Sequence, residues 1–191
     1  MLVYFQIMIG LERGTVKLVP HQKEWVDSAG KIMEELRHLL GDAVTDIQHI
    51  GSTAIPSIHA KPIIDLAVAV RDLEDILPYV EVLKQHHIIF RGEIITGEIL
   101  FVIGSDEVRT HHIHIVRWNG TEWNNYINFR DYLNAYPEKA VLYDTCKQRL
   151  AMRFSGDRKK YTAGKEETIQ CLLEEARIWK SHQAALHLLE S

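Results

Sequence analysis

Apolar positions in the first third of the chain predict an amphipathic helix followed by two strands. Apolar side chains recur at helical spacing through residues 21–40, and Gly41 ends the pattern. A short strand is predicted at 47–50, with an apolar residue at each end. Residues 63–70 form a run that is apolar on both faces, which is typical of a central strand buried in a sheet.

The middle of the chain predicts one further helix and then several strands. Asp72 is a suitable N-cap for a helix that extends to about residue 87. Pro78 lies inside this helix and is expected to kink it. Strands are then predicted at 88–90, 94–103 and 108–117.

After Asn119-Gly120 the pattern becomes helical nearly to the end of the chain. Helices are predicted at 121–136, 138–152 and 162–188. This order of elements predicts an α+β fold, in which a mixed β-sheet is flanked by helices and carries a C-terminal helical cap. The sheet-rich part ends near residue 118, and the helical part covers 119–191. A length of 191 residues suits a single domain of this kind.

Composition and charge exclude several classes of protein. The chain has 22 basic and 26 acidic residues, a net charge of −4, and 46% apolar residues, as in a soluble globular protein. The acidic balance argues against a dedicated nucleic-acid surface or a polybasic membrane-binding surface. No apolar run reaches the roughly 18 residues of a membrane span, and the first nine residues lack the basic start of a signal peptide. We therefore expect a cytoplasmic protein, as a monomer or a homodimer.

Asp65 interrupts the otherwise apolar run at 63–70. A buried carboxylate is costly unless it is paired, coordinated or hydrogen-bonded. One interpretation is a structural salt bridge, to Lys61 or to Arg117. The other is a metal ligand at the rim of the sheet, and the residue types alone leave both open.

The segment Gly51-Ser52-Thr53 directly follows the strand predicted at 47–50. Such a turn presents backbone N–H groups and two hydroxyls, which can hold a phosphate. The surrounding residues form neither the P-loop of nucleotide-hydrolysing proteins nor the nucleophile elbow of serine hydrolases. A plain turn without a ligand is the alternative interpretation.

His112 and His114 alternate along the strand predicted at 108–117, so they share one face of it, and His111 takes the other. Two imidazoles on one face suit a divalent metal or a phosphate. A solvated or partly buried strand face is the alternative in a chain with 11 histidines. The histidine-triad hydrolase pattern is excluded, because Val116 occupies the third alternate position.

The helical part carries cations and hydroxyl groups that would neutralise a triphosphate if they face the sheet. A solvated helix surface is the alternative for each of them taken singly. The group comprises Arg130, Lys147, Arg153, Lys160, Tyr161 and Lys165.

Several of these motifs together resemble the GrpB family. The resemblance covers about residues 16–180. Residues 1–14 lie outside it, which predicts a single GrpB-like domain over 15–191 after an extension that forms an arm or an extra strand. The resemblance rests on the segments 49–56 and 60–65, His112-Ile113-His114, the segment 129–133, Pro137, Tyr143, Lys147, Tyr161 and Lys165.

The GrpB family is similar in fold to nucleotidyltransferases, and this resemblance implies a role for each group. Ser52, Asp65, His112 and His114 would form the catalytic group. Of these, Asp65 and the two histidines would hold a divalent metal, with nitrogen ligands favouring Mn²⁺, Zn²⁺ or Fe²⁺ over Mg²⁺. The phosphates of a nucleotide would be bound by Gly51, Ser52, Thr53, Lys61, Arg130, Lys147, Tyr161 and Lys165.

The sequence departs from the nucleotidyltransferase pattern at Ala67, where a second acid usually stands two residues after the first. Three functions therefore remain open. The first is metal-dependent nucleotidyl or phosphoryl transfer from a nucleotide to a small acceptor. The second is a nucleotide-binding or regulatory module without turnover, which Ala67 favours. The third is a metal-dependent phosphoesterase that uses the pair His112 and His114.

Overall fold

The centre of the molecule is a mixed β-sheet. The computed structural model describes residues 9–190, with side chains through residue 186. The described strands form one six-stranded sheet in the order β2-β3-β6-β5-β4, with β1 paired to β6. Only the β3–β6 pair is parallel within the described sheet. The strands are β1 Leu11–Glu12, β2 Val44–Ile50, β3 Ile64–Val70, β4 Ile88–Ile95, β5 Glu98–Gly104 and β6 Val108–Arg117.

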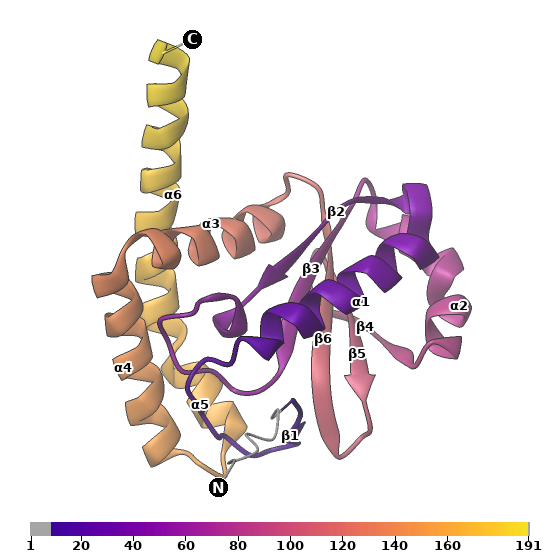
Figure 1. Ribbon diagram of the computed structural model, residues 1–191, viewed down its shortest axis with the longest axis horizontal. Helices are drawn as coiled ribbons and strands as arrows, with labels where there is room; N and C mark the ends of the chain where they lie inside the picture. The colour runs from indigo at the N-terminus through magenta and orange to yellow at the C-terminus, as the bar shows by residue number, and fades with distance from the viewer. Residues whose placement is uncertain (1–8, 191) are drawn as a thin grey trace, which may run out of the picture.

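Helices cover both faces of this sheet, so the predicted α+β architecture is confirmed (Figure 1). The first two helices lie on one face, and the third lies on the other. The last three continue from the third as a helical layer beside the sheet, and the final helix extends past the body of the molecule. The helices are α1 Glu24–Leu40, α2 Val80–Gln85, α3 Thr121–Ala135, α4 Pro137–Arg153, α5 Arg158–Gly164 and α6 Glu166–Glu190.

Alternation along β3 divides the core between the two faces of the sheet. Leu66 belongs to the apolar cluster that contains Trp25 of α1. Ala67 belongs to the opposite cluster, which contains Trp123 of α3. Asp65 shares the Ala67 face, so its carboxylate lies on the side of the sheet that carries α3 and the C-terminal helices.

The segment predicted as one helix from residue 72 to residue 87 is helical from residue 73 to residue 85, but only its second part is an α-helix. Leu73–Tyr79 form a 3₁₀ helix, with Asp72 as its N-cap in a capping box. Pro78 lies inside it and has no N–H to donate to an α-helical hydrogen bond. The α-helix α2 therefore begins only at Val80.

Two other predicted elements are divided by local turns. The strand predicted at 94–103 is interrupted at Gly97, which has φ +86° and donates its N–H to the Glu93 carboxylate. The helix predicted at 162–188 begins earlier, at Arg158, and is interrupted at Lys165 before α6. The helix starts earlier because Asp157 is its N-cap: the side chain of Asp157 accepts a hydrogen bond from the Lys160 N–H.

The predicted extension, residues 1–14, is described only from residue 9. Leu11 pairs with Arg109, and Glu12 pairs with Val108, so this part of the chain adds a short strand beside β6. The extension boundary itself stays a prediction.

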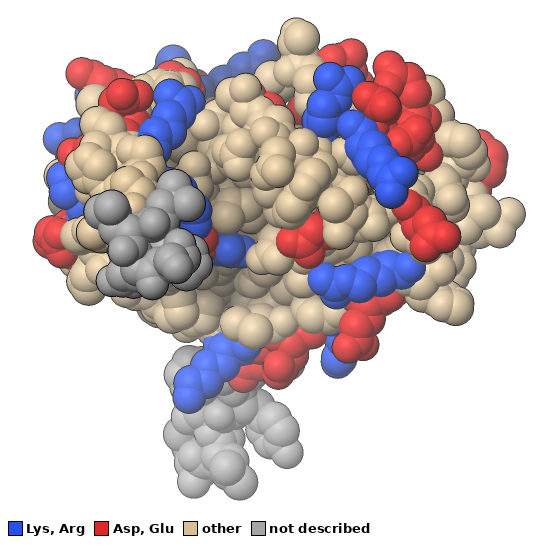
Figure 2. All heavy atoms as spheres, turned by 90° about the horizontal axis from the view of Figure 1, so that it is seen from above, with Lys and Arg blue, Asp and Glu red and all other residues tan. Residues whose placement is uncertain are grey.

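Charged side chains of both signs are mixed on the face of the molecule seen in Figure 2. Lys and Arg lie beside Asp and Glu around this face, and uncharged residues, drawn in tan, lie between them. Among the described residues, no helix is both long enough and apolar enough to cross a bilayer.

Candidate functional site

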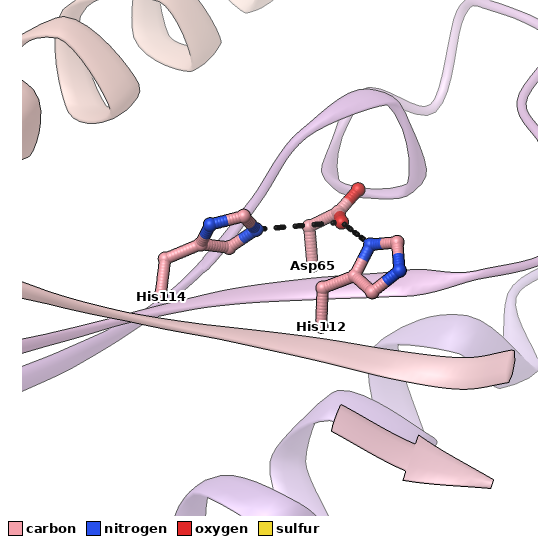
Figure 3. Close-up of side chains that lie close together, drawn as sticks. All are labelled: Asp65, His112 and His114. Carbon is pink, nitrogen blue, oxygen red and sulfur yellow. Dashed lines mark hydrogen bonds and ion pairs between the residues drawn. The ribbon is translucent and has the colours of Figure 1, made fainter. Parts of the chain in front are cut away.

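The parallel pairing of β3 with β6 places Asp65 directly beside His112. His112 Nδ1 lies 3.0 Å from Asp65 Oδ1, and His114 Nε2 lies 3.7 Å from the same oxygen. Figure 3 shows both imidazoles turned toward the carboxylate from the neighbouring strand. One nitrogen or oxygen from each of the three side chains lies within 4.8 Å of the others, so they can hold one metal ion.

A second carboxylate, Glu98 on β5, holds the far side of His114. Its Oε1 lies 2.7 Å from His114 Nδ1, and its Oε2 accepts the Tyr126 hydroxyl at 2.5 Å. Nδ1 of His114 donates to Glu98, so Nε2 is the nitrogen that faces Asp65 and that would bind a metal once it has lost its proton. Glu98 was not predicted from the sequence, although an acidic residue at the start of an apolar strand was a visible signal.

Electrostatic partners set the protonation of this group. Burial by itself would raise the pKa of Asp65, but hydrogen bonds with His112 and His114 lower it far below its usual range. Burial would likewise lower the pKa of His114, but Asp65 and Glu98 raise it to about 9. The salt bridge suggested between Asp65 and Arg117 is wrong, since Arg117 pairs with Asp72 at 3.1 Å.

Gly51 brings the turn after β2 against the Asp65 carboxylate. It has φ +69° and ψ −170°, a conformation that glycine adopts readily and other residues rarely do. A Cβ at this position would lie 2.6 Å from Asp65 Oδ2. The glycine is therefore required both by the backbone conformation and by this close approach.

The two hydroxyls of the turn differ in their partners. Ser52 Oγ accepts a hydrogen bond from Lys147 Nζ at 3.2 Å. Thr53 is buried, and its Oγ1 lies 2.9 Å from His49 Nε2, so this hydroxyl fixes the turn. Burial lowers the pKa of His49 to about 4, which keeps that imidazole neutral.

A cavity of about 260 Å³ lies between the sheet, this turn and the C-terminal helices. It brings together most of the predicted site residues: the turn, Asp65 and His112 on one side, and predicted phosphate-binding residues on the other. The residues that line it are Leu18, Gly51, Ser52, Thr53, Lys61, Ile63, Asp65, His112, Tyr143, Lys147, Arg158, Tyr161, Thr162 and Lys165.

Four cations of this cavity share space with two tyrosine rings. Lys61 Nζ and Lys165 Nζ lie 5.4 Å and 4.8 Å from the centre of the Tyr161 ring. Lys147 Nζ lies 4.8 Å from the Tyr143 ring centre. These contacts are within range of cation–π attraction, and Arg158 supplies the fourth positive charge.

Burial and mutual repulsion lower the pKa of these lysines. Burial, with Lys165 and Arg158 nearby, lowers the pKa of Lys61 to about 8. Burial lowers the pKa of Lys147 to about 7 although Asp144 opposes the change. Burial also lowers the pKa of Lys165. An anion in the cavity would restore their charged forms.

Lys147 is held in place by the chain itself. Its ammonium group donates to the backbone carbonyl of His59 and lies 3.6 Å from Asp144 Oδ1. Asp144 also accepts from the His59 backbone N–H at 2.9 Å. This network fixes Lys147 above Ser52 without a ligand.

Three of the predicted cations do not line this cavity. Arg130 donates to Gln48 Oε1 and to the His49 carbonyl, so it supports the end of β2. Arg153 packs over its neighbour Phe154, and the exposed Lys160 pairs with the side chain that caps α5.

Arg158 is the cation that the sequence analysis missed. Arg158, Tyr161 and Lys165 are separated by three and then four positions, which places them on one face of a helical turn. That spacing was a usable signal, but the boundary predicted for this helix began at residue 162 and excluded Arg158.

Comparison with known proteins identifies the family of the chain. Residues 15–175 match the GrpB protein family. The chain is 37% identical to glutamate-rich protein GrpB of Alkalihalophilus pseudofirmus over 173 residues, covering 88% of this chain and 99% of the relative. The crystal structure of GrpB from Enterococcus faecalis is similar with a TM-score of 0.79 and 30% identity, covering 85% of this chain and 99% of that one.

More distant structures indicate the wider fold. The Cid1 poly(U) polymerase, in its MgGTP-bound structure, is similar with a TM-score of 0.51 and 14% identity, covering 70% of this chain and 44% of the polymerase. At this identity the likeness concerns the fold alone. The chain belongs to the GrpB protein family, and it has a nucleotidyltransferase-like fold.

Proposed function

We propose that the protein binds a nucleotide in the 260 Å³ cavity and transfers a nucleotidyl or phosphoryl group to a small acceptor, with a divalent metal as cofactor. One observation carries the proposal: Asp65 and His112 border the same cavity as the Gly51-Ser52 turn and four cations. A carboxylate–imidazole group beside a cation-lined pocket is suited to phosphate chemistry.

The residues present fit a metal with nitrogen and oxygen ligands. Asp65 offers a carboxylate oxygen, and His112 and His114 each offer a ring nitrogen. Glu98 supports one ligand from behind by accepting from His114 Nδ1, as carboxylates commonly do behind metal-bound histidines. This donor set favours Mn²⁺ or Zn²⁺. When bound, the metal would polarise a phosphoryl oxygen and stabilise negative charge on it.

The remaining residues bind and orient the phosphates. In nucleotidyl transfer, an acceptor oxygen attacks the α-phosphorus and the bond from that phosphorus to the bridging oxygen breaks. Pyrophosphate leaves, and the proton of the acceptor passes to water. Lys147, Arg158 and Lys165 are placed to hold the leaving pyrophosphate, because they line the helical side of the cavity.

A panel of nucleotides with Mg²⁺, Mn²⁺ and Zn²⁺ tests the proposal by thermal shift. A ligand at 100 times its Kd stabilises the folded state by about 2.7 kcal/mol. We expect a shift that needs both nucleotide and metal, and that Asp65→Asn removes. Asp42→Asn, in an exposed 3₁₀ turn, is the matched control and should keep the shift. A shift that survives in Asp65→Asn contradicts the assigned metal site.

The second candidate is a nucleotide-binding module without turnover, and the surroundings of Ala67 favour it. Ala67 is fully buried and belongs to the apolar cluster beneath α3, so an apolar side chain takes the place of the usual second acid. The two candidates differ in one result. Incubation of the complex with candidate acceptors leaves the nucleotide intact in a binding module, whereas a transferase releases pyrophosphate or nucleoside diphosphate.

A further inference from the structure

A second cavity, of about 280 Å³, adjoins the first and shares two lining residues with it. His112 and Arg158 border both cavities. The second one lies over the β4–β5 side of the sheet, where Leu100 and Val102 give it an apolar lining. It is therefore adjacent to the metal-ligand group but is built largely from other elements.

Arginines supply most of the charge of this second cavity. Arg13 follows β1, Arg91 lies on β4, Arg109 lies on β6, and Arg158 begins α5. Asp106 accepts hydrogen bonds from Arg91 at 2.8 Å and from Arg109 at 3.1 Å. Its side chain is 79% exposed, so one solvated carboxylate pairs with two of the four guanidinium groups. The cavity keeps a net positive charge.

Arg109 has hydrogen-bonding capacity that the described residues leave unused. Its side chain is only 8% exposed. Nη2 donates to Asp106, but Nη1 is buried and has no hydrogen-bond partner among the described residues. A buried N–H without an acceptor is unfavourable, and an anionic oxygen in the cavity would supply that acceptor. Guanidinium groups bind phosphate oxygens well because their N–H groups form paired hydrogen bonds with them.

We propose that this arginine cavity, formed by Arg13, Arg91, Arg109 and Arg158, binds the acceptor, and that the acceptor is a small phosphate monoester. The role as acceptor rests on the proposed function, whereas the binding needs only the cavity. The phosphate group lies among the arginines, and the carbon part of the molecule lies against the apolar lining. The shared wall at His112 brings the attacking oxygen toward the nucleotide.

Isothermal titration of phenyl phosphate into the full chain tests the binding. This probe combines a dianionic phosphate monoester with an apolar ring. We expect saturable binding to the wild type and a loss of about tenfold or more in Arg91→Gln and in Arg109→Gln, from the typical strength of charged hydrogen bonds. Arg149→Gln removes an exposed positive charge from α4 and should bind as the wild type does.

Three results would overturn the inference. They are an absence of saturable binding to the wild type, unchanged affinity in Arg91→Gln, and a loss of affinity only in Lys165→Gln, which places the phosphate in the first cavity. Arg109 is buried, so Arg109→Gln is first checked by urea unfolding. Arg91 and Arg13 are exposed, and their variants decide the question if Arg109→Gln does not fold.

The inference and the proposed function fail separately. Binding of phenyl phosphate without any metal-dependent nucleotide shift retains the arginine site and removes the transferase proposal. A metal-dependent nucleotide shift without phenyl phosphate binding retains the transferase proposal and removes the arginine site. If both hold, Arg91→Gln should keep the nucleotide shift, because Arg91 lines only the second of the two cavities.

Discussion

On the sheet side of the first cavity, each charged group faces an opposite one. Asp65 lies between His112 and His114, and Glu98 lies behind His114. On the helical side, Lys147, Lys165 and Arg158 gather with Lys61, from the loop before β3, around two tyrosine rings, and the pKa of each lysine is lowered. The sheet side is therefore paired before a ligand arrives, whereas the helical side gains from an anion.

This difference assigns separate roles to the two sides. Paired groups hold a fixed geometry, which a metal site needs. Groups of one sign repel each other until an anion enters, so part of the binding free energy of that anion comes from relief of the repulsion. The comparison can be tested at the boundary between the two sides, on each side alone, and through their opposite responses to pH.

Gly51→Ala acts at the boundary and should have the largest effect. The backbone conformation alone costs a non-glycine residue about 1–3 kcal/mol, and the new methyl group would also press on Asp65 Oδ2. We expect a clear loss of stability in urea unfolding and a loss of metal-dependent nucleotide binding. Gly156→Ala, where an added Cβ meets nothing within 4 Å, is the control. Equal stability of the two variants would show that the turn is not constrained as described.

Glu98→Gln acts on the sheet side alone. It keeps an oxygen for the Tyr126 hydroxyl but removes the charge behind His114. Loss of such a supporting carboxylate typically lowers metal affinity by about 10–100-fold. Titration with Mn²⁺ or Zn²⁺ measures the change. Glu107→Gln, on an exposed turn, should bind metal as the wild type does, and an unchanged affinity in Glu98→Gln would remove its supporting role.

Arg158→Gln changes the helical side of the first cavity and leaves its sheet side intact, and because Arg158 also lines the second cavity, nucleotide binding is measured without an acceptor. It removes one cation from the cavity, so nucleotide affinity should fall by about tenfold, from the typical strength of a charged hydrogen bond. Lys160→Gln is the matched control two residues away, since Lys160 is exposed and pairs with Asp157. Metal affinity without nucleotide should stay unchanged in both variants. Equal nucleotide affinity in the two would show that Arg158 does not contact the phosphates.

The fold was largely predictable because its sheet is patterned strongly. The run at 63–70 is apolar on both faces and became the buried central strand β3. The errors arose where a short local cause overrides periodicity, as at Pro78, Gly97 and the cap residue Asp157. Pairing order could not be derived in the same way, because apolar alternation does not state which strands are neighbours.

The candidate site was predictable where spacing along one element decides it. His112 and His114 share a strand face by alternation alone. Their approach to Asp65 depends on the parallel β3–β6 register, which joins residues 47 positions apart. The orientation of Arg130 away from the cavity likewise depends on how α3 packs against β2, so sequence left it open.

The two sides should respond to pH with opposite signs in metal-free protein. The folded-state pKa of His114, about 9, lies above its ordinary value of 6.5. Its contribution to stability is complete below pH 6.5 and is lost as pH rises through 9. The folded-state pKa of Lys147, about 7, lies below its ordinary value of 10.5. Between pH 7 and 10.5, Lys147 is therefore protonated in the unfolded chain and neutral in the folded protein, so its contribution to stability rises with pH over this range.

Lys147→Met separates the two contributions through the slope of stability against pH. Each titrating group changes the free energy of unfolding by at most about 1.4 kcal/mol per pH unit. In the wild type the two signs partly cancel between pH 7 and 9. The variant loses the rising contribution, so its stability should fall more steeply across that range. Urea unfolding at pH 7, 8 and 9 in the presence of a chelator measures the slopes. Parallel slopes would mean that Lys147 titrates near its ordinary value, and burial with the neighbouring lysines would then not disfavour its charged form.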